Sequence, residues 1–242
     1  MPAATLWQAL ADLVLPASCA GCSREGQPLR LEVCGDCAAA VQALRAAPTR
    51  PDPPPPGLPP CVALGDYAAE LRELILSFKE RGRHRLARPL GALLAEAVAA
   101  TVPPSAPVLL LYVPDTTAAA RARHGDHLRA LTRAAADRLR EAGRVVAVAA
   151  PLRALPKADS AHLSSAQRAA AAAAGFAMRS RGMADVRRAA PGSVTLLLDD
   201  IVTTGSTLAA ASELLAGAGV RVHGCVVLAA TRRIPPQRAI WS

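Results

Sequence analysis

Two adjacent carboxylates, Asp199 and Asp200, follow directly after a run of five apolar or β-branched residues at 194–198. Such a run indicates a strand that is buried on both faces, as in a parallel sheet. A short turn comes next, and residues 208–216 have the composition of a helix. The turn is rich in hydroxyl groups: Thr203, Thr204, Gly205, Ser206 and Thr207. This order predicts a phosphate-binding loop, because backbone N–H groups and the helix dipole converge at the start of such a helix.

The two acids require a binding partner of their own, since they would repel a phosphate. Vicinal hydroxyl groups, which donate hydrogen bonds to carboxylates, or a divalent cation would satisfy them. A sugar phosphate meets both requirements. The alternative is a strand-to-helix turn in which the acids and threonines only cap the helix. That alternative explains two acids more easily than it explains the whole string.

Four cysteines form two Cys-x-x-Cys pairs that are separated by eleven residues: Cys19, Cys22, Cys34 and Cys37. Two such turns supply four thiolates in the tetrahedral arrangement that suits Zn²⁺. Because four thiolates leave no open coordination position, the predicted zinc is structural. Disulfides or free thiols are the alternative. Cys61 and Cys225 lie outside the pattern and are expected to be core residues.

Strand-like apolar runs alternate with helical patterns through most of the chain. This order predicts an α/β fold with a Rossmann-like, mainly parallel sheet and right-handed crossovers. Ligands bind such sheets at the carboxyl ends of the strands, so the loops at that edge should face Asp199. The expected strands lie at residues 62–67, 108–113, 145–152, 194–198 and 222–230.

The loop after the strand at 108–113 carries Arg121 and Arg123, which could bind a pyrophosphate with paired hydrogen bonds. His124 and His127 lie in the same loop, and contacts to substrate or to Asp126 are expected for them.

A second basic turn, around Lys79, is a candidate anion-binding loop, and a solvated turn is the alternative. The segment after residue 152 is a candidate lid over the substrate.

Three parts are predicted along the chain. Residues 1–47 would form an N-terminal helix and the four-cysteine zinc module, and residues 61–242 the α/β domain. Residues 48–60 are dense in proline and predict a stiff linker that cannot join a sheet.

The net charge of +9 over 242 residues suits polyanionic partners, either phosphorylated substrates or nucleic acids. Arginines on solvated helix faces are the alternative explanation. Aromatic residues make up only 2% of the chain, which argues against a dedicated groove for single strands. The sequence shows neither a signal peptide nor an apolar segment of membrane length, so we expect a cytoplasmic protein without membrane insertion.

The string at residues 194–208 resembles the phosphoribosyl-pyrophosphate (PRPP) signature of type I phosphoribosyltransferases. The resemblance implies that Asp199 and Asp200 are the catalytic acids and hold the ribose 2′- and 3′-hydroxyls. It implies that the turn from Thr203 to Thr207 holds the 5′-phosphate, with Mg²⁺ bound to PRPP. Arg121, Arg123 and Lys79 would then stabilise the pyrophosphate. Some relatives carry an Asp at the position of Thr203 as a candidate general base, and this chain does not.

The order of features along nearly the whole chain is similar to the ComF family. The shared points are the N-terminal apolar helix, the Cys-x-x-Cys pairs, Phe78-Lys79, Val113-Pro114 and Leu163…Arg168…Phe176. The chain departs from the family at Arg123-His124-Gly125, where the glycine is displaced by one, and at Ala171, where Asn is common. Both departures lie near the expected pyrophosphate or acceptor side, so PRPP binding is better supported than turnover.

Membership of the ComF family would imply a role in DNA uptake during natural competence, and two functions follow from it. The first is transfer of a phosphoribosyl group from PRPP, or a related sugar phosphate, to an unknown acceptor. The second is a non-catalytic nucleic-acid-binding competence factor that uses the same phosphate–ribose pocket. Its partners would be single-stranded DNA and a competence helicase.

Overall fold

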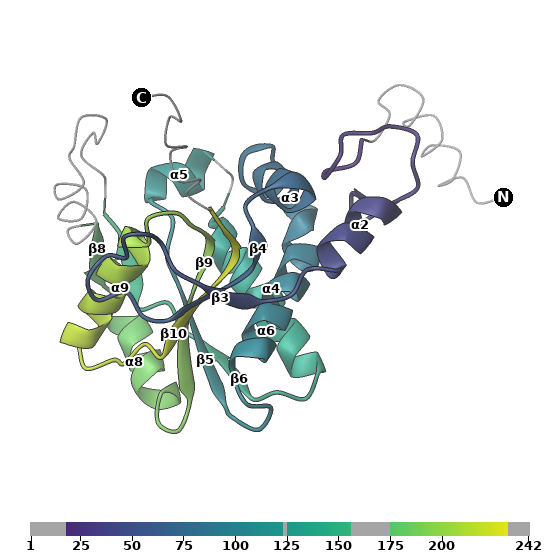
Figure 1. Ribbon diagram of the computed structural model, residues 1–242. Coiled ribbons are helices and arrows are strands. Elements are labelled where there is room, and N and C mark those ends of the chain that lie inside the picture. Colours follow the sequence, from purple (N-terminus) through teal and green to yellow (C-terminus); the bar gives the residue numbers. More distant parts are fainter. Residues whose placement is uncertain (1–17, 123–124, 156–174, 232–242) are drawn as a thin grey trace, which may run out of the picture.

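The computed structural model describes residues 18–122, 125–155 and 175–231, and the statements below concern these residues (Figure 1). The expected N-terminal helix, most of the candidate lid and the basic C-terminal tail lie outside the described residues.

Six strands form the central sheet, in the order β3-β4-β10-β9-β5-β6. All neighbours in this sheet are parallel except β3 and β4, which are antiparallel. The predicted α/β fold with a mainly parallel sheet is therefore confirmed. The strands are β3 (Ala47–Thr49), β4 (Cys61–Asp66), β5 (Val108–Tyr112), β6 (Val146–Val148), β9 (Val194–Val202) and β10 (Gly224–Ala230).

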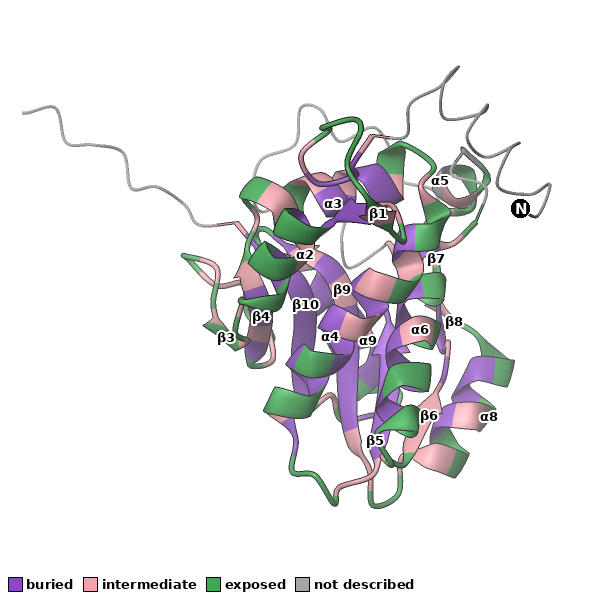
Figure 2. Cartoon of the chain, turned by 90° about the vertical axis from the view of Figure 1, so that its right-hand side faces the viewer, coloured by how far each residue is buried: buried purple, intermediate pink, exposed green. Residues whose placement is uncertain are grey.

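Helices cover both faces of the sheet, which lies buried between them (Figure 2). One face carries α3 (Ala69–Glu80), α4 (Ala87–Thr101) and α6 (His127–Glu141). The other face carries α8 (Ser180–Ala189) and α9 (Ser206–Gly217).

The packing of the central strand β9 explains why three leucines follow one another in its sequence. Leu196 and Leu198 pack into the core beneath α4 and α6, whereas Leu197 packs into the core beneath α9. Successive side chains of a strand point to opposite faces, so a strand covered on both faces buries apolar residues at consecutive positions.

The cysteine-rich segment folds as a hairpin and a helix beside α3. Strands β1 (Leu29–Arg30) and β2 (Val33–Cys34) are antiparallel, and α2 (Gly35–Gln42) follows them. Residues of this segment belong to the same buried core as α3 and α4. The N-terminal module therefore packs directly on the α/β domain.

The prediction of a single strand at residues 145–152 is wrong, because two separate strands occupy this region. The region divides at Pro151 into β6 and β7 (Leu152–Ala154), and β7 leaves the central sheet to pair with β8 (Phe176–Met178). Proline lacks the N–H that would continue the ladder, which explains the break.

The proline-rich segment differs from the expected linker at both ends. Its first residues belong to β3, in which Pro48 lies opposite Val62 of β4. A proline is tolerated there because β3 is an edge strand and one side of it forms no ladder. Farther along, Leu58 packs against the core beneath α9. The segment therefore lies against the domain along its length.

Two short helical elements complete the described part of the chain. They are η1 (His84–Leu86), which leads into α4, and α5 (Thr117–Ala122), which follows β5. Among the described residues, no helix is both long and apolar enough to cross a membrane.

Gly91 sets the close approach of α4 to α6. A Cβ atom at this position would lie 2.4 Å from the Cβ of Ala134 and 3.0 Å from the backbone nitrogen of Ala135. We expect Gly91→Ala to lower the free energy of unfolding by about 1–3 kcal/mol, because overpacking outweighs the better helix propensity of alanine. Urea denaturation would measure this.

Gly217→Ala is the matched control, because a Cβ atom at the end of α9 meets nothing within 4 Å. Its stability should be unchanged or slightly raised. Equal effects of the two substitutions would contradict the packing explanation.

Candidate functional site

The acid pair lies near the end of the central strand, at the edge where the parallel strands end. Asp199 and Asp200 belong to β9, and the loop after them leads into α9. Asp200 points to the face covered by α3 and α6, because its carboxylate contacts residues of both helices. Asp199 precedes it by one position and lies opposite Val227 of β10, which packs beneath α9. The two carboxylates therefore lie on either side of the strand end.

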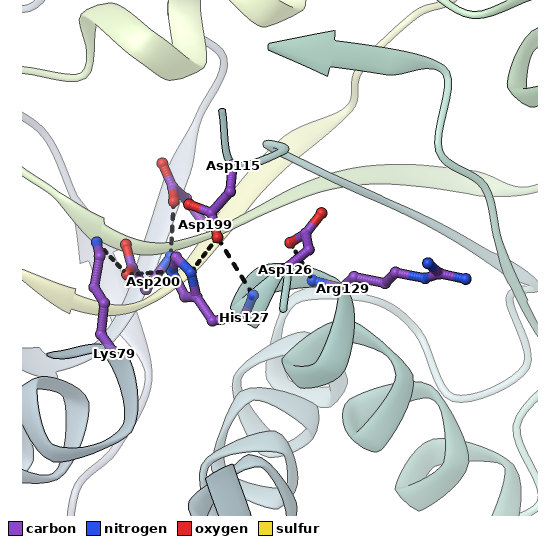
Figure 3. A network of polar contacts seen from close by, with 7 residues as sticks. All are labelled: Lys79, Asp115, Asp126, His127, Arg129, Asp199 and Asp200. Atoms are coloured by element: carbon purple, nitrogen blue, oxygen red, sulfur yellow. Dashed lines mark hydrogen bonds and ion pairs between the residues drawn. The ribbon is translucent and has the colours of Figure 1, made fainter. Parts of the chain in front are cut away.

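Asp200 is buried and is held by two cationic groups (Figure 3). Its Oδ2 atom accepts hydrogen bonds from Lys79 Nζ at 2.7 Å and from His127 Nε2 at 3.0 Å. The other ring nitrogen of His127, Nδ1, is hydrogen-bonded to Asp115. Four residues from β9, α3, α6 and the loop after β5 thus form one chain of contacts. A buried carboxylate requires partners of this kind.

The network separates the pKa values of the two acids. Burial alone would raise the pKa of Asp200, but His127 and Lys79 outweigh it and lower that pKa below its usual range. Burial, with the negative charge of Asp200 added, raises the pKa of Asp199 well above its usual range. Asp200 is therefore fixed as an anion, whereas Asp199 is shifted toward its neutral form.

This charge balance reduces the repulsion that two adjacent carboxylates would exert on a phosphate. The negative charges of Asp115 and Asp200 face the positive charges of His127 and Lys79. The raised pKa of Asp199 shifts this acid toward its neutral form, which lowers the negative charge at the strand end. An anionic sugar phosphate can approach it and still find carboxylate oxygens for its hydroxyls.

The turn after β9 has the features of a phosphate-binding loop. Gly205 adopts a left-handed backbone conformation with φ of 73° and precedes the first residue of α9. The hydroxyl oxygens of Thr204 and Ser206 lie 3.1 Å apart. Thr203 and Thr204 are exposed, and Thr207 is partly exposed, so hydroxyl groups face the solvent at a helix N-terminus.

Gly205 is also a point of close packing. A Cβ atom there would lie 2.9 Å from Leu58 Cδ2 and 3.1 Å from Pro51 Cγ. The proline-rich segment thus forms one wall of the loop, a contact that its composition did not indicate.

The predicted basic residues are not all brought to the acids. Lys79 reaches the site, but it pairs with Asp200, whereas a pyrophosphate contact was expected for it. Arg121 is exposed on α5, which lies at the same end of the sheet as α3 (Figure 1). Arg123 and His124 lie outside the described residues.

Sequence reasoning missed Asp115 and assigned His127 other partners. Asp126, the expected partner of His127, instead caps α6 by accepting a hydrogen bond from the backbone N–H of Arg129 at 2.9 Å. The position of Asp115 offered a signal: it follows the strand at 108–113 at the same sheet edge as Asp199. An acid there could have been paired with the nearest histidine.

The four predicted zinc ligands come together at the N-terminal module. The sulfur atoms of Cys19, Cys22, Cys34 and Cys37 all lie within 4.8 Å of one another, and those of Cys22 and Cys34 are 3.8 Å apart. With Zn–S bonds of about 2.3 Å, the edges of a tetrahedral site are about 3.8 Å long. None of the six cysteines forms a disulfide. The cluster could therefore hold a structural zinc ion.

The surroundings of two of the four cysteines, Cys19 and Cys22, favour thiolates, which are the form that binds metal, whereas burial and the neighbouring thiols raise the pKa of Cys37 above its usual range. Backbone N–H groups of Gly21 and Cys34 point at Cys19 Sγ, at 3.4 and 3.3 Å. Burial would raise the pKa of Cys19, but these and neighbouring N–H groups lower it to about 6. The backbone and side chain of Arg24 lower the pKa of Cys22 in the same way. The donor set fits zinc.

A cavity of about 840 Å³ lies elsewhere, between the hairpin of this module, α2 and α4. Leu29, Val41 and Leu93 are among its lining residues, and neither the acids nor the loop at 203–207 lines it. It is not part of the site at the sheet edge.

The pKa of His127 yields a prediction about stability. Burial would lower this pKa, but the hydrogen bonds and charges of Asp115 and Asp200 raise it from 6.5 to about 9. The raised pKa means that the protonated ring of His127 stabilises the folded state. This stabilisation is complete below pH 6.5 and is lost as the pH rises through about 9, because above that pH the folded state binds no more protons at His127 than the unfolded state does. It amounts to something on the order of 3 kcal/mol. Urea denaturation at several pH values should show wild-type stability falling between pH 7 and 9.5 more steeply than that of His127→Gln. Parallel curves would contradict the network.

The cysteine cluster yields a prediction about metal content. Purified full-length protein should contain about one zinc per chain by mass spectrometry of the metals, because four thiolates close one tetrahedral site. Cys34→Ser should lower the content to less than half. Cys225→Ala, which changes a buried cysteine outside the cluster, should leave it unchanged. Equal zinc in both variants would exclude the cluster as the site.

Comparison with known proteins agrees with this geometry. Residues 123–241 match the family described as the phosphoribosyl transferase domain. The match includes the acid pair, the loop at 203–207 and His127, and it begins after Lys79, Asp115 and the cysteine cluster. No curated protein matches the chain. Residues 123–241 are therefore similar to a phosphoribosyltransferase domain, and a four-cysteine cluster that could bind zinc precedes them in the chain.

Proposed function

We propose that this protein binds PRPP at the end of β9 and belongs to the ComF family, with a role in DNA uptake during natural competence. The observation that carries the binding proposal is the charge-balanced acid pair directly before a hydroxyl-rich loop at the N-terminus of α9. Such an arrangement offers carboxylates to vicinal hydroxyls and N–H groups to a phosphate. The competence role rests on the sequence resemblance alone.

In this proposal Asp199 and Asp200 bind the ribose 2′- and 3′-hydroxyls, and residues 203–207 bind the 5′-phosphate. Asp200 acts as a fixed acceptor, because His127 and Lys79 hold it as an anion. Asp199, in its neutral form, can also donate a hydrogen bond. The ribose would lie across the strand end between the two carboxyl groups.

If the protein is an enzyme, the reaction is transfer of the phosphoribosyl group. A lone pair of the acceptor nitrogen forms a bond to ribose C1, and the C1–O bond to pyrophosphate breaks with its electrons on the oxygen. Positive charge develops at C1 in the transition state, and the fixed negative charge of Asp200 stabilises it. The acceptor proton leaves to solvent, since Thr203 stands where some relatives have a base.

The charge of the departing pyrophosphate fits a divalent cation. Lys79 is engaged with Asp200, and Arg121 is exposed on α5, so the described site offers the pyrophosphate few cationic side chains. Mg²⁺ bound to PRPP supplies the missing positive charge. Arg123, outside the described residues, is the further candidate.

The alternative hypothesis is a non-catalytic protein that binds single-stranded DNA in the same phosphate–ribose pocket, with a competence helicase as partner. The net charge of +9 favours it, and the scarcity of aromatic residues opposes it. The binding experiment below includes both ligands.

Titration calorimetry with PRPP and Mg²⁺ tests the proposal. We expect the wild type to bind, and Asp200→Asn to weaken binding by about 10- to 100-fold, because the ribose hydroxyls lose a charged hydrogen-bond partner worth roughly 1.5–3 kcal/mol. Asp199→Asn should weaken binding less than Asp200→Asn, because a neutral amide still accepts and donates hydrogen bonds. Asp137→Asn is the matched control, because Asp137 pairs with Arg140 on the exposed face of α6.

A single-stranded oligonucleotide is titrated in parallel at two salt concentrations. If the wild type binds the oligonucleotide tightly and in a salt-sensitive way but does not bind PRPP, the proposal is overturned in favour of the alternative hypothesis of a DNA-binding protein.

A further inference from the structure

The last turn of α3 contacts both the cysteine cluster and the acid pair. Ser77 Oγ donates a hydrogen bond to the carbonyl oxygen of Ala20 at 2.9 Å, and Ala20 lies between Cys19 and Cys22. The ring of Phe78 meets that of His127 edge to face, with centroids 6.1 Å apart. Lys79 forms the ion pair with Asp200. Successive residues of a helix point about 100° apart, so three of them reach three different neighbours.

The contact between α3 and the first cysteine turn is buried at Ser77, and a second pair of hydrogen bonds comes from Arg83. Ser77, Ala20 and Phe78 are all buried. Arg83, just after α3, donates hydrogen bonds to the carbonyl oxygen of Ser18 at 2.6 Å and to its Oγ at 2.9 Å. The residues on either side of Cys19 are therefore bonded to α3 or to the turn that follows it.

The conformation of this cysteine turn depends on its sulfur atoms being held together. Binding of zinc to four thiolates contributes directly to the folding of such a module. When the turn is ordered, the carbonyl groups of Ser18 and Ala20 are fixed, and with them the end of α3. When the turn is not ordered, the carbonyl groups that accept hydrogen bonds from Ser77 and Arg83 are no longer fixed. The end of α3, with Phe78 and Lys79, is then held less firmly.

We propose that α3 couples the cysteine cluster to the acid pair, so that zinc at the cluster strengthens ligand binding at the end of β9. Ser77 and Phe78 act as positioning residues: the first ties α3 to the cluster, and the second holds the ring of His127 beside Asp200. The coupling does not require that the ligand be PRPP, although its second test below rests on the proposed function.

The first test needs no sugar phosphate. Zinc affinity is measured by competition with a chelating dye in full-length protein, for the wild type, Lys79→Met and Arg72→Met. Lys79 is far from the cysteines in sequence but anchors the end of α3 to Asp200. Its loss should weaken zinc binding about 5-fold or more, a coupling in the ordinary range. Arg72 lies two turns earlier on the same helix and pairs with Glu73 at the surface, so its substitution should change zinc affinity less than about 2-fold. Equal affinities of all three proteins would overturn the coupling.

The second test measures PRPP affinity with and without zinc, after circular dichroism has verified that the zinc-free protein keeps its helices. Coupling is reciprocal, so the ratio of the two dissociation constants should equal the factor by which PRPP tightens zinc. In Ser77→Ala this ratio should fall toward 1. Ser193→Ala is the matched control, because its Oγ also donates to a backbone carbonyl, that of Ala189, far from both sites.

The outcomes separate the two proposals. If the zinc-loaded wild type binds no PRPP, the proposed function fails. The zinc affinities measured by dye competition then decide by themselves whether α3 couples the two sites. If PRPP binds with the same affinity whether or not zinc is present, the coupling fails and the proposed function stands.

Discussion

A carboxylate buried at the end of a parallel strand cannot remain ionised without cationic partners, and in this protein Asp200 is such a group. Its partners come from α3 and α6, and one of them is itself held by an acid in the loop after β5. The end of α3 and the start of α6 must therefore lie within hydrogen-bonding distance of the tip of β9, and the loop after β5 must reach the ring of His127. The sheet order makes this feasible, because β5 and β10 flank β9 and their carboxyl ends share its edge.

The same arrangement explains how one strand end can present two acids to an anionic ligand. Alternation along β9 sends Asp200 toward α3 and α6 and leaves Asp199 on the side of α9. His127 and Lys79 offset the charge of Asp200, and burial shifts Asp199 toward its neutral form, so the negative charge at the strand end is reduced. The separation of the two pKa values thus favours the approach of a phosphate at this place.

Many local features of the fold and of the site could be predicted from the sequence. The contacts that could not be predicted join residues whose proximity depends on the folded sheet. The apolar run before Asp199, the hydroxyl-rich turn and the Cys-x-x-Cys spacing are local patterns, and each predicted a local structure correctly. The partner of Lys79 is 121 residues away, and only the folded sheet brings the two together. His127 and Asp115 are closer, but nothing in their spacing indicates that one ring links two carboxylates. The prolines at 48–60 predicted a stiff segment. That the start of this segment pairs with β4 as an edge strand depends on the assembled sheet and cannot be seen in the local sequence.

The contact of Leu58 and Pro51 with Gly205 has a consequence for how the chain can be divided. Residues that look like a spacer supply an edge strand, through β3, and a wall of the loop before α9. Removing everything before residue 61 would uncover the edge of β4, a template for pairing with other chains, and would leave the loop unsupported on one side. The described N-terminal segment thus shares an edge strand and a loop wall with the α/β sheet, so a cut at residue 61 would not separate the four-cysteine segment cleanly from the sheet.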